Sequence, residues 1–444
     1  MSKSSLACLV GSLLFVAGCF PVELDVNGNS ELLVARQEGF FVYDPASHKA
    51  SMLLAAKGER PVFARFAPDG RQALLVTNTR SIDEYRFAVM NLPGSTPRTI
   101  YTGRNTALAL FSPDGKYLAV SRVAEKERKN AANINEILLI DLANDITTTL
   151  LEETLFSFRW FNDSKRLALF KIEDTNEGAM TGYVVEFDIA TKKEKRLATA
   201  SVTGQTMCIE LRPDQQTIVF SAANAGKPGA NLDGLEKHAG LGTPLWLWNA
   251  KDGSVTKIDD HAEYARFSPK GDRLLLARMD RTGQGELRIA NADGRGAKKL
   301  IDGVTLSINR DVMLPGWLND DTVYYFTTRH TYGAGEKALA LITIRTDGKN
   351  QKSIQAALDH AVRQIVKNLP EPDPNSDIGV LNDPAPVPEK KAVERAQSNR
   401  GWTATVFSTD GLVVFAATTL IVVVLAVFLI RRVRRPTKKP ETPA

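Results

Sequence analysis

The stretch LALFSPDGKYLAV, residues 108–120, decides the fold, because its pattern recurs along the chain. A second strong copy is FARFAPDGRQALLV, residues 63–76. Weaker copies read ELDVNGNSELLV, SFRWFNDSKRLAL, CIELRPDQQTIVF, YARFSPKGDRLLL and LPGWLNDDTVYYF. Each copy reads as an apolar strand, a tight turn and a second strand. The second turn residues lie about 42 to 56 residues apart, in the range of propeller repeats, and they are Asn27, Asp69, Asp114, Asp163, Asp214, Lys270 and Asp320.

Aligning the copies gives three columns that have a physical meaning. Before the turn stands a large apolar residue: Leu24, Phe66, Phe111, Trp160, Leu211, Phe267 or Trp317. In the second strand stands another: Leu33, Leu75, Val120, Leu169, Phe220, Leu276 or Phe326. A third strand ends in Asp or Asn at Asp44, Asn91, Asp141, Asp188, Asn249 and Asn291, with Asp347 displaced by one position. Asp and Asn start turns by accepting a hydrogen bond from the backbone two residues on.

Four strands per repeat predict an all-β fold, a β-propeller over residues 19–353. In the second copy the strands are expected at 62–66, 72–77, 85–91 and 98–102. One four-stranded sheet cannot bury both of its faces, whereas sheets stacked around an axis can, and closure of the ring protects their edges. The repeats predict seven four-stranded blades, or six if the divergent first copy is only a tether.

The phrase FSPDGKYLA at residues 111–119 resembles the WD-like repeat of TolB-like propellers, which also occurs in prolyl-oligopeptidase-type enzymes. The resemblance covers roughly residues 21–353 and implies the fold, but it says little about function. The repeats leave room for neither the separate N-terminal domain of TolB nor the hydrolase domain of the peptidases.

The N-terminus has the pattern of a secretory signal peptide over residues 1–18. Lys3 precedes a short apolar run, and the sequence then reads Val-Ala-Gly-Cys, ending at Cys19. This resembles the lipobox of bacterial lipoproteins, which implies cleavage before Cys19 and lipid attachment to its sulfur. Ordinary cleavage after Gly18 is the alternative.

The C-terminus predicts a transmembrane helix at residues 411–430, which contain no charge. At about 1.5 Å per residue this stretch spans the roughly 30 Å hydrocarbon core of a bilayer. Residues 431–444 hold six basic residues and one acidic residue, so this tail accounts for the net charge of +5. By the positive-inside rule the tail is cytoplasmic. We therefore expect a single-pass protein of the inner membrane with a periplasmic propeller.

Two segments connect the propeller to the membrane. Residues 354–368 have a helical pattern, and the Pro-rich residues 369–410 predict an extended linker, or stalk. The body without the basic tail is neutral, so the charge does not point to a nucleic-acid partner. Cys208 is the one thiol of the body and is expected in the core.

Candidate catalytic residues are few. Asp69 and Asp114 belong to a repeated turn, which explains them without catalysis. The sequence contains no P-loop, G-x-S-x-G, H-E-x-x-H or EF-hand pattern. We therefore expect no enzyme, no cofactor and no metal. The alternative is a polysaccharide lyase of the propeller type, which would hold a metal through His238, His261 and His330.

The loops between the second and third strands predict the binding face, because charged, variable loops on a rigid scaffold commonly carry function. Loop 122–136 contains Lys126, Arg128 and Lys129, and loop 171–182 contains Glu173 and Asp174. Loop 222–243 contains Lys227, Lys237 and His238 and is expected to be an insertion that folding does not need. We expect these loops to bind another envelope protein; a purely structural tethering role is the third possibility.

Overall fold

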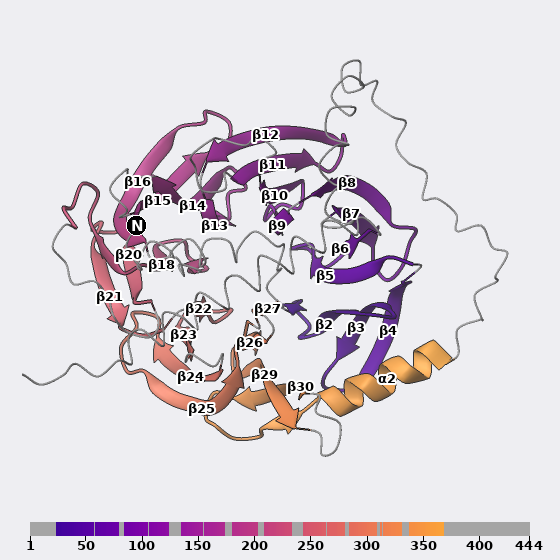
Figure 1. Ribbon diagram of the computed structural model, residues 1–444. Coiled ribbons are helices and arrows are strands. Elements are labelled where there is room, and N and C mark those ends of the chain that lie inside the picture. The colour runs from indigo at the N-terminus through magenta and orange to yellow at the C-terminus, as the bar shows by residue number, and fades with distance from the viewer. Residues whose placement is uncertain are drawn as a thin grey trace, which may run out of the picture. The chain divides into compact units, whose positions relative to one another are not determined.

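The computed structural model describes residues 24–367 except 57, 80–83, 105, 124–134, 154, 174–179, 203–207, 233–242, 263, 280–283, 309–310, 313 and 331–336. Seven antiparallel sheets follow one another around a central axis, and the last lies beside the first (Figure 1). The seven-bladed all-β propeller expected from the repeats is confirmed, and the first copy is a blade and not only a tether.

The first three blades are each formed by four consecutive strands. Blade one contains β1 (Asp25–Val26), β2 (Leu32–Arg36), β3 (Gly39–Asp44) and β4 (Lys49–Ala55). Blade two contains β5 (Arg60–Phe66), β6 (Gln72–Asn78), β7 (Glu84–Asn91) and β8 (Arg98–Arg104). Blade three contains β9 (Thr106–Phe111), β10 (Tyr117–Val123), β11 (Asn135–Asp141) and β12 (Ile146–Glu153). The strands expected in blade two agree with these bounds within two residues at every end.

The other four blades repeat this plan with two additions. Blade four contains β13 (Leu155–Trp160), β14 (Arg166–Glu173), β15 (Met180–Asp188), β16 (Glu194–Val202) and β19 (Asn224–Gly226). Blade five contains β17 (Ile209–Leu211), β18 (Thr217–Ser221), β20 (Leu245–Asn249) and β21 (Val255–Asp259). Blade six contains β22 (Tyr264–Phe267), β23 (Arg273–Met279), β24 (Gln284–Asn291) and β25 (Lys298–Thr305). A short hairpin, β26 (Ser307–Ile308) and β27 (Asp311–Val312), leads to blade seven, which contains β28 (Gly316–Asn319), β29 (Thr322–His330), β30 (Lys337–Arg345) and β31 (Lys352–Ser353).

The repeated turn owes its shape to the aspartate and the glycine. In blade two the Asp69 carboxylate accepts a hydrogen bond from the amide of Arg71 at 2.9 Å. Gly70 follows with a φ of 66°, a conformation that costs glycine little. Ser164 and Gln215 adopt a similar positive φ in blades four and five, where the sequence copies are weaker. The positive φ of the turn is therefore kept even in copies where another residue replaces the glycine.

The two apolar columns form the contacts within and between blades. Val120, Leu169 and Phe220 of the second-strand column are fully buried. In the column before the turn, the Trp160 indole donates to the carbonyl of Leu110 in the preceding blade at 3.1 Å. In blade seven the Trp317 indole makes the same contact with the carbonyl of Arg266 in blade six, again at 3.1 Å. The columns found in the sequence are thus the packing surfaces of adjacent blades.

Among the strands that the structure describes, the ring closes without an exchanged strand, since each blade is built from one continuous region of the chain apart from β19. At the seam between blades seven and one, the Tyr324 hydroxyl donates to the carbonyl of Leu24 at 2.7 Å. The helix α2 (Gln355–Lys367) packs on β4 and β30, so it covers this seam (Figure 1). Its Asp359 pairs with Arg36 of blade one at 2.6 Å. The helix expected after the propeller therefore fastens the ring.

The structure corrects the expectation that loop 222–243 is independent of the fold. Ala222 and Ala223 are buried, and the next three residues form β19, which pairs with the outer strand β16 of blade four. The amide of Gly229 also donates to the Thr199 hydroxyl at 3.1 Å. Residues 222–229 are thus part of the scaffold, because they cover an edge that would otherwise be open.

The signal peptide, the stalk, the segment at 411–430 and the basic tail lie outside the described residues. Within the ranges that the structure does describe, no helix has the length and apolar character needed to cross a membrane.

The Asx turns at the ends of the third strands make the fold sensitive to acid. Hydrogen bonds from the Ser47 hydroxyl and the Ala46 amide lower the pKa of Asp44 below its ordinary value of 3.8. The amide and hydroxyl of Thr191 likewise lower the pKa of Asp188. A carboxyl whose pKa is lower in the folded chain stabilises the fold above its unfolded pKa. That contribution is lost as the pH falls through the folded value.

We therefore expect the melting temperature to fall as the pH drops from about 5 to about 3. The double variant Asp44→Asn, Asp188→Asn should show a shallower fall, because asparagine keeps the acceptor oxygen and does not titrate. Thermal unfolding followed by circular dichroism across this range measures both slopes. Identical slopes in the variant and the parent protein would contradict the assignment.

Candidate functional site

Two faces of the propeller differ in their loops. The turn face carries the repeated Pro-Asp-Gly and Asx turns, and the loop face carries the hairpins between the second and third strands. In blade three the hairpin β10–β11 is paired without interruption up to Val123 opposite Asn135. In blade four the hairpin β14–β15 is paired without interruption up to Glu173 opposite Thr181. These neighbouring hairpins therefore carry loops 124–134 and 174–179 on a regular base.

The structure places two of the eight residues predicted for the binding face. Glu173 ends β14, where its backbone is described, and Lys227 is exposed just after β19. The remaining six lie outside the described residues: Lys126, Arg128, Lys129, Asp174, Lys237 and His238. Their assignment to the binding face stays a prediction.

Ion pairs at the base of the hairpins were not found from the sequence. In blade three, Arg122 pairs with Glu136 across the strands at 2.8 Å, and the Glu136 carboxylate is buried. Arg122 also donates to the Tyr101 hydroxyl of blade two at 3.1 Å. Burial alone would lower the pKa of Arg122, but Glu136 and Tyr101 together raise it. The guanidinium therefore stays charged and holds two blades together at the loop face.

The same position carries a cation in blade six. Arg278 pairs with Asp259 of blade five at 2.8 Å and with Glu286 across the strands at 3.4 Å. The Asp259 carboxylate also accepts hydrogen bonds from the amides of His261 and Ala262, both at 2.8 Å. Arg122 and Arg278 occupy corresponding places in their repeats, eight residues after the second turn residue. That recurrence is the sequence signal that could have revealed them.

The thiol of the propeller body is structural. Cys208 is 4% exposed and its sulfur contacts the carbonyl of Ala265 at 3.4 Å. Burial raises the pKa of this thiol to about 12, so it is not a thiolate at neutral pH. The expected place of Cys208 in the core is confirmed.

Histidines do not converge in the part of the chain that the structure describes. His261 is exposed, His360 lies on the exposed side of α2, and His48 contacts the Tyr43 hydroxyl at 3.0 Å. Among the described residues no group of three His, Cys, Asp or Glu side chains is arranged to hold a metal ion. His238 and the side chain of His330 lie outside this description.

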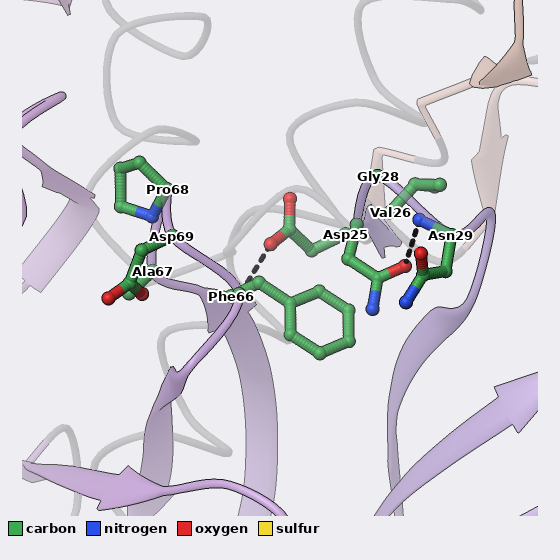
Figure 2. Close-up of a pocket in the computed structure, with 10 residues that line it drawn as sticks. Asp25, Val26, Gly28, Asn29, Phe66, Ala67, Pro68 and Asp69 are labelled. Carbon is green, nitrogen blue, oxygen red and sulfur yellow. Dashed lines mark hydrogen bonds between the residues drawn. The ribbon is translucent and has the colours of Figure 1, made fainter.

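A cavity of about 460 Å³ lies on the turn face between blades one and two (Figure 2). Asp25, Asn27, Phe66 and Asp69 line it, and the Asp25 carboxylate accepts a hydrogen bond from the amide of Phe66. The first copy reads Val-Asn-Gly at residues 26–28, where the second copy reads Pro-Asp-Gly. The divergent turn of the first copy thus forms one wall of this cavity.

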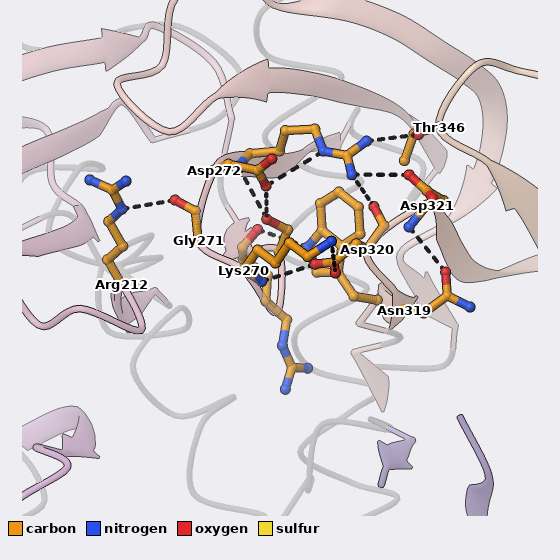
Figure 3. A network of polar contacts seen from close by, with 12 residues as sticks. Arg212, Lys270, Gly271, Asp272, Asn319, Asp320, Asp321 and Thr346 are labelled. Carbon is orange, nitrogen blue, oxygen red and sulfur yellow. Dashed lines mark hydrogen bonds and ion pairs between the residues drawn. The ribbon is translucent and has the colours of Figure 1, made fainter. Parts of the chain in front are cut away.

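On the same face the turns of blades five, six and seven form a polar network (Figure 3). Arg212 donates to the carbonyl of Gly271 at 2.8 Å, and Lys270 pairs with Asp320 at 3.1 Å. Arg273 donates to the carbonyl of Asp320 in the next blade. These contacts join consecutive blades, so the charged residues here serve the scaffold.

Comparison with known proteins identifies the fold and not a family. No protein-family model matches the chain, and no curated protein does. Among solved structures, oligogalacturonate lyase from Vibrio parahaemolyticus matches with a TM-score of 0.51 and 13% identity over 74% of this chain and 88% of that chain. A structure from a study of two prolyl endopeptidases gives 0.52 and 13% identity, over 79% of this chain and 53% of that chain. TolB from Acinetobacter baumannii gives 0.43 and 15% identity, over 72% and 77%.

These likenesses lie well below 25% identity, so they show the fold alone. Propellers of this kind occur both in enzymes and in TolB. The class that fold and repeats define is a seven-bladed, all-β propeller.

Proposed function

We propose that this protein is a non-catalytic binding propeller, anchored in the cytoplasmic membrane, whose loop face engages another envelope protein on the outer side. The observation that carries the proposal is the pair of hairpins in blades three and four. Both are regularly paired up to the base of their loops, and the loops carry opposite charges. Binding residues on a rigid base lose little freedom when a partner docks, which favours recognition.

The remaining charged groups support a scaffold role. Arg122 joins blades three and two through Tyr101, and Arg278 joins blades six and five through Asp259. Asp44 and Asp188 shape turns. A catalytic site normally contains ionisable groups whose shifted pKa values have no structural purpose. In the described part of the chain, each of these groups has a structural role.

The direction of the first strand supports a partner near the membrane. β1 runs into the turn at Asn27, which lies on the turn face, so the chain enters blade one from the loop face. A lipid on Cys19 would then hold the loop face close to the bilayer. We infer that the partner is an envelope protein presented at the membrane surface.

Site-directed crosslinking in spheroplasts tests the face and the topology together. The single variants Arg128→Cys, in loop 124–134, and Glu177→Cys, at an acidic residue of loop 174–179, each receive a membrane-impermeant maleimide that carries a photoreactive group. Cys208 gives little background, because its thiol is buried and its pKa is about 12. We expect both variants to be labelled from outside and both to form an adduct of the same size with one partner. Asp214→Cys, exposed on the turn face, is the matched control and should be labelled without forming that adduct.

Two outcomes would contradict the proposal. Failure to label any of the three cysteines from outside would show that the propeller does not face the exterior. An adduct formed from position 214 alone would assign binding to the turn face. Replacing residues 233–242 with a short linker is a further check, since the scaffold residues 222–229 remain; the variant should fold and lose part of the capture. Stoichiometric metal in the purified protein, with cleavage of a uronic-acid oligosaccharide, would favour the lyase instead.

A further inference from the structure

The outer strands of the blades differ in how their free edges are protected. An edge strand presents unpaired N–H and C=O groups, and proteins usually cover such edges or place charges on them. In blade one the helix α2 packs on β4, and in blade four β19 pairs with β16. The longer outer strands that the structure describes without such cover are β8, β12, β21 and β25.

Three of these four strands carry basic residues on the free edge. β8 begins and ends with arginine, β21 contains Lys257, and β25 begins with Lys298 and Lys299. β12 reads ITTTLLEE, so its first six residues carry no charge. Among the described outer strands, β12 therefore has an edge that is neither covered nor charged over this length.

β12 also carries an exposed apolar side chain. Ile146 is 56% exposed and is the one large hydrophobic side chain so exposed among the described residues. Thr147, Thr148 and Thr149 are exposed as well. A shallow groove of about 160 Å³ beside the strand is lined by Tyr117, Leu139, Asp141, Ile146 and Thr148. A free edge next to an apolar groove is suited to the addition of another strand.

We infer that β12 pairs antiparallel with β12 of a second copy of this chain. A two-fold axis at Thr148 would join two four-stranded blades into one continuous sheet. In this register Thr148 lies opposite its own copy and Thr147 lies opposite Thr149, all within the regular part of β12 that ends at the bulge at Leu150. Threonine pairs across strands are favourable, and like charges directly opposite are not. The sequence from Ile146 to Leu151 meets both conditions, because it pairs threonines with each other and contains no charged residue.

The second copy is a better occupant than an unrelated strand, because the surface is complementary to itself. Both copies contribute the same residues of β12, so the interface requires no second binding surface elsewhere on the chain. Pairing would cover Ile146 of both copies, which removes the exposed apolar side chain from water. On the other side, β12 is already fixed by β11, with Thr148 opposite Leu139. The edge is therefore preformed from Ile146 to Thr149, up to the β-bulge at Leu150.

Disulfide trapping of the full-length protein in detergent tests the register. Residues directly opposite in an antiparallel pair have Cβ atoms about 4.5–5.5 Å apart, close to the separation in a disulfide. Thr148→Cys should therefore form a covalent dimer under mild oxidation. The matched control is Thr102→Cys, on the exposed part of the outer strand β8, which should remain monomeric on the gel. The parent protein reports the background from its own cysteines.

Charge variants test the same contact without a covalent bond. Thr148→Lys places two like charges at the axis, and Thr148→Glu does the same with the opposite sign. Each variant alone should be shifted from dimer to monomer in light scattering, whereas an equal mixture should recover a dimer that contains both chains. Because Thr148 is exposed, each variant should melt as a folded propeller. The corresponding Thr102 variants should leave the dimer unchanged.

Three results would overturn the inference. The parent protein could be monomeric in detergent and give no Thr148→Cys dimer. It could be a dimer that the Thr148→Lys change leaves intact, which would assign association to another part of the chain. It could also bind a different protein at β12 with no self-association, which would replace the second copy by that partner.

Discussion

Replacing Leu358 with aspartate is expected to unfold the propeller or open its ring. Leu358 is 1% exposed in the middle of α2 and packs, with Val362 and Ile354, into the core between blades seven and one. An unpaired buried carboxylate costs several kcal/mol, which is comparable to the whole stability of a typical domain. The milder Leu358→Ala should cost about 2–5 kcal/mol.

The expectation follows from how the ring closes. In the described part of the chain, no strand of blade one belongs to the sheet of blade seven, so the seam there depends on side-chain packing, on Tyr324 and on α2. The helix also contributes the ion pair between Asp359 and Arg36. Thermal unfolding and limited proteolysis measure the loss. His360→Asp, on the exposed side of the same helix, is the control and should change the stability by no more than about 0.5 kcal/mol.

Equal melting temperatures for Leu358→Asp and His360→Asp would show that α2 does not fasten the seam. Early proteolysis confined to the seam, with the other blades protected, would show that the ring opens locally. A simultaneous loss of all protection would show that the seven blades unfold as one cooperative unit. Either pattern is consistent with the role of the helix, and the two differ in how far the opening spreads.

The repeat explains why so much of the fold could be predicted from the sequence. A Pro-Asp-Gly turn is a local structure, because Asp69 accepts from the amide of Arg71 and Gly70 supplies the positive φ. Local rules of this kind act at every copy, so the spacing of the copies fixes the number of blades. The apolar columns that contain Phe111 and Val120 could be predicted because successive side chains of a strand alternate between its two faces.

Contacts between distant parts of the chain could not be predicted in this way. β19 lies in blade four although its residues come from the loop of blade five. Arg278 and Asp259 come from adjacent blades, and α2 reaches β4 across the whole repeat region. Neither periodicity nor turn chemistry encodes which surfaces meet in space. The predicted binding loops share this limit, because their charges identify a surface and not its partner.

A charge at Phe111 is expected to have an effect as large as that at Leu358. Phe111 ends the inner strand β9, is 8% exposed and packs with Leu118, Ile140 and Ala67 in the core between blades two and three. Phe111→Asp buries a carboxylate in this core and also removes a large apolar side chain, so the free energy of unfolding should fall by several kcal/mol. Phe111→Leu keeps an apolar side chain and should lose much less.

The melting temperatures of these two variants and of Thr102→Asp measure the difference. Thr102 is exposed on β8 of the adjacent blade, so aspartate there should leave the melting temperature near that of the parent protein. The same substituent is thus placed at a buried and at an exposed strand position of neighbouring blades. Similar melting temperatures for Phe111→Asp and Thr102→Asp would mean that the column before the turn does not face the core. In that case the alignment of all seven copies would be displaced by one residue, since a shift of one position exchanges the two faces of a strand.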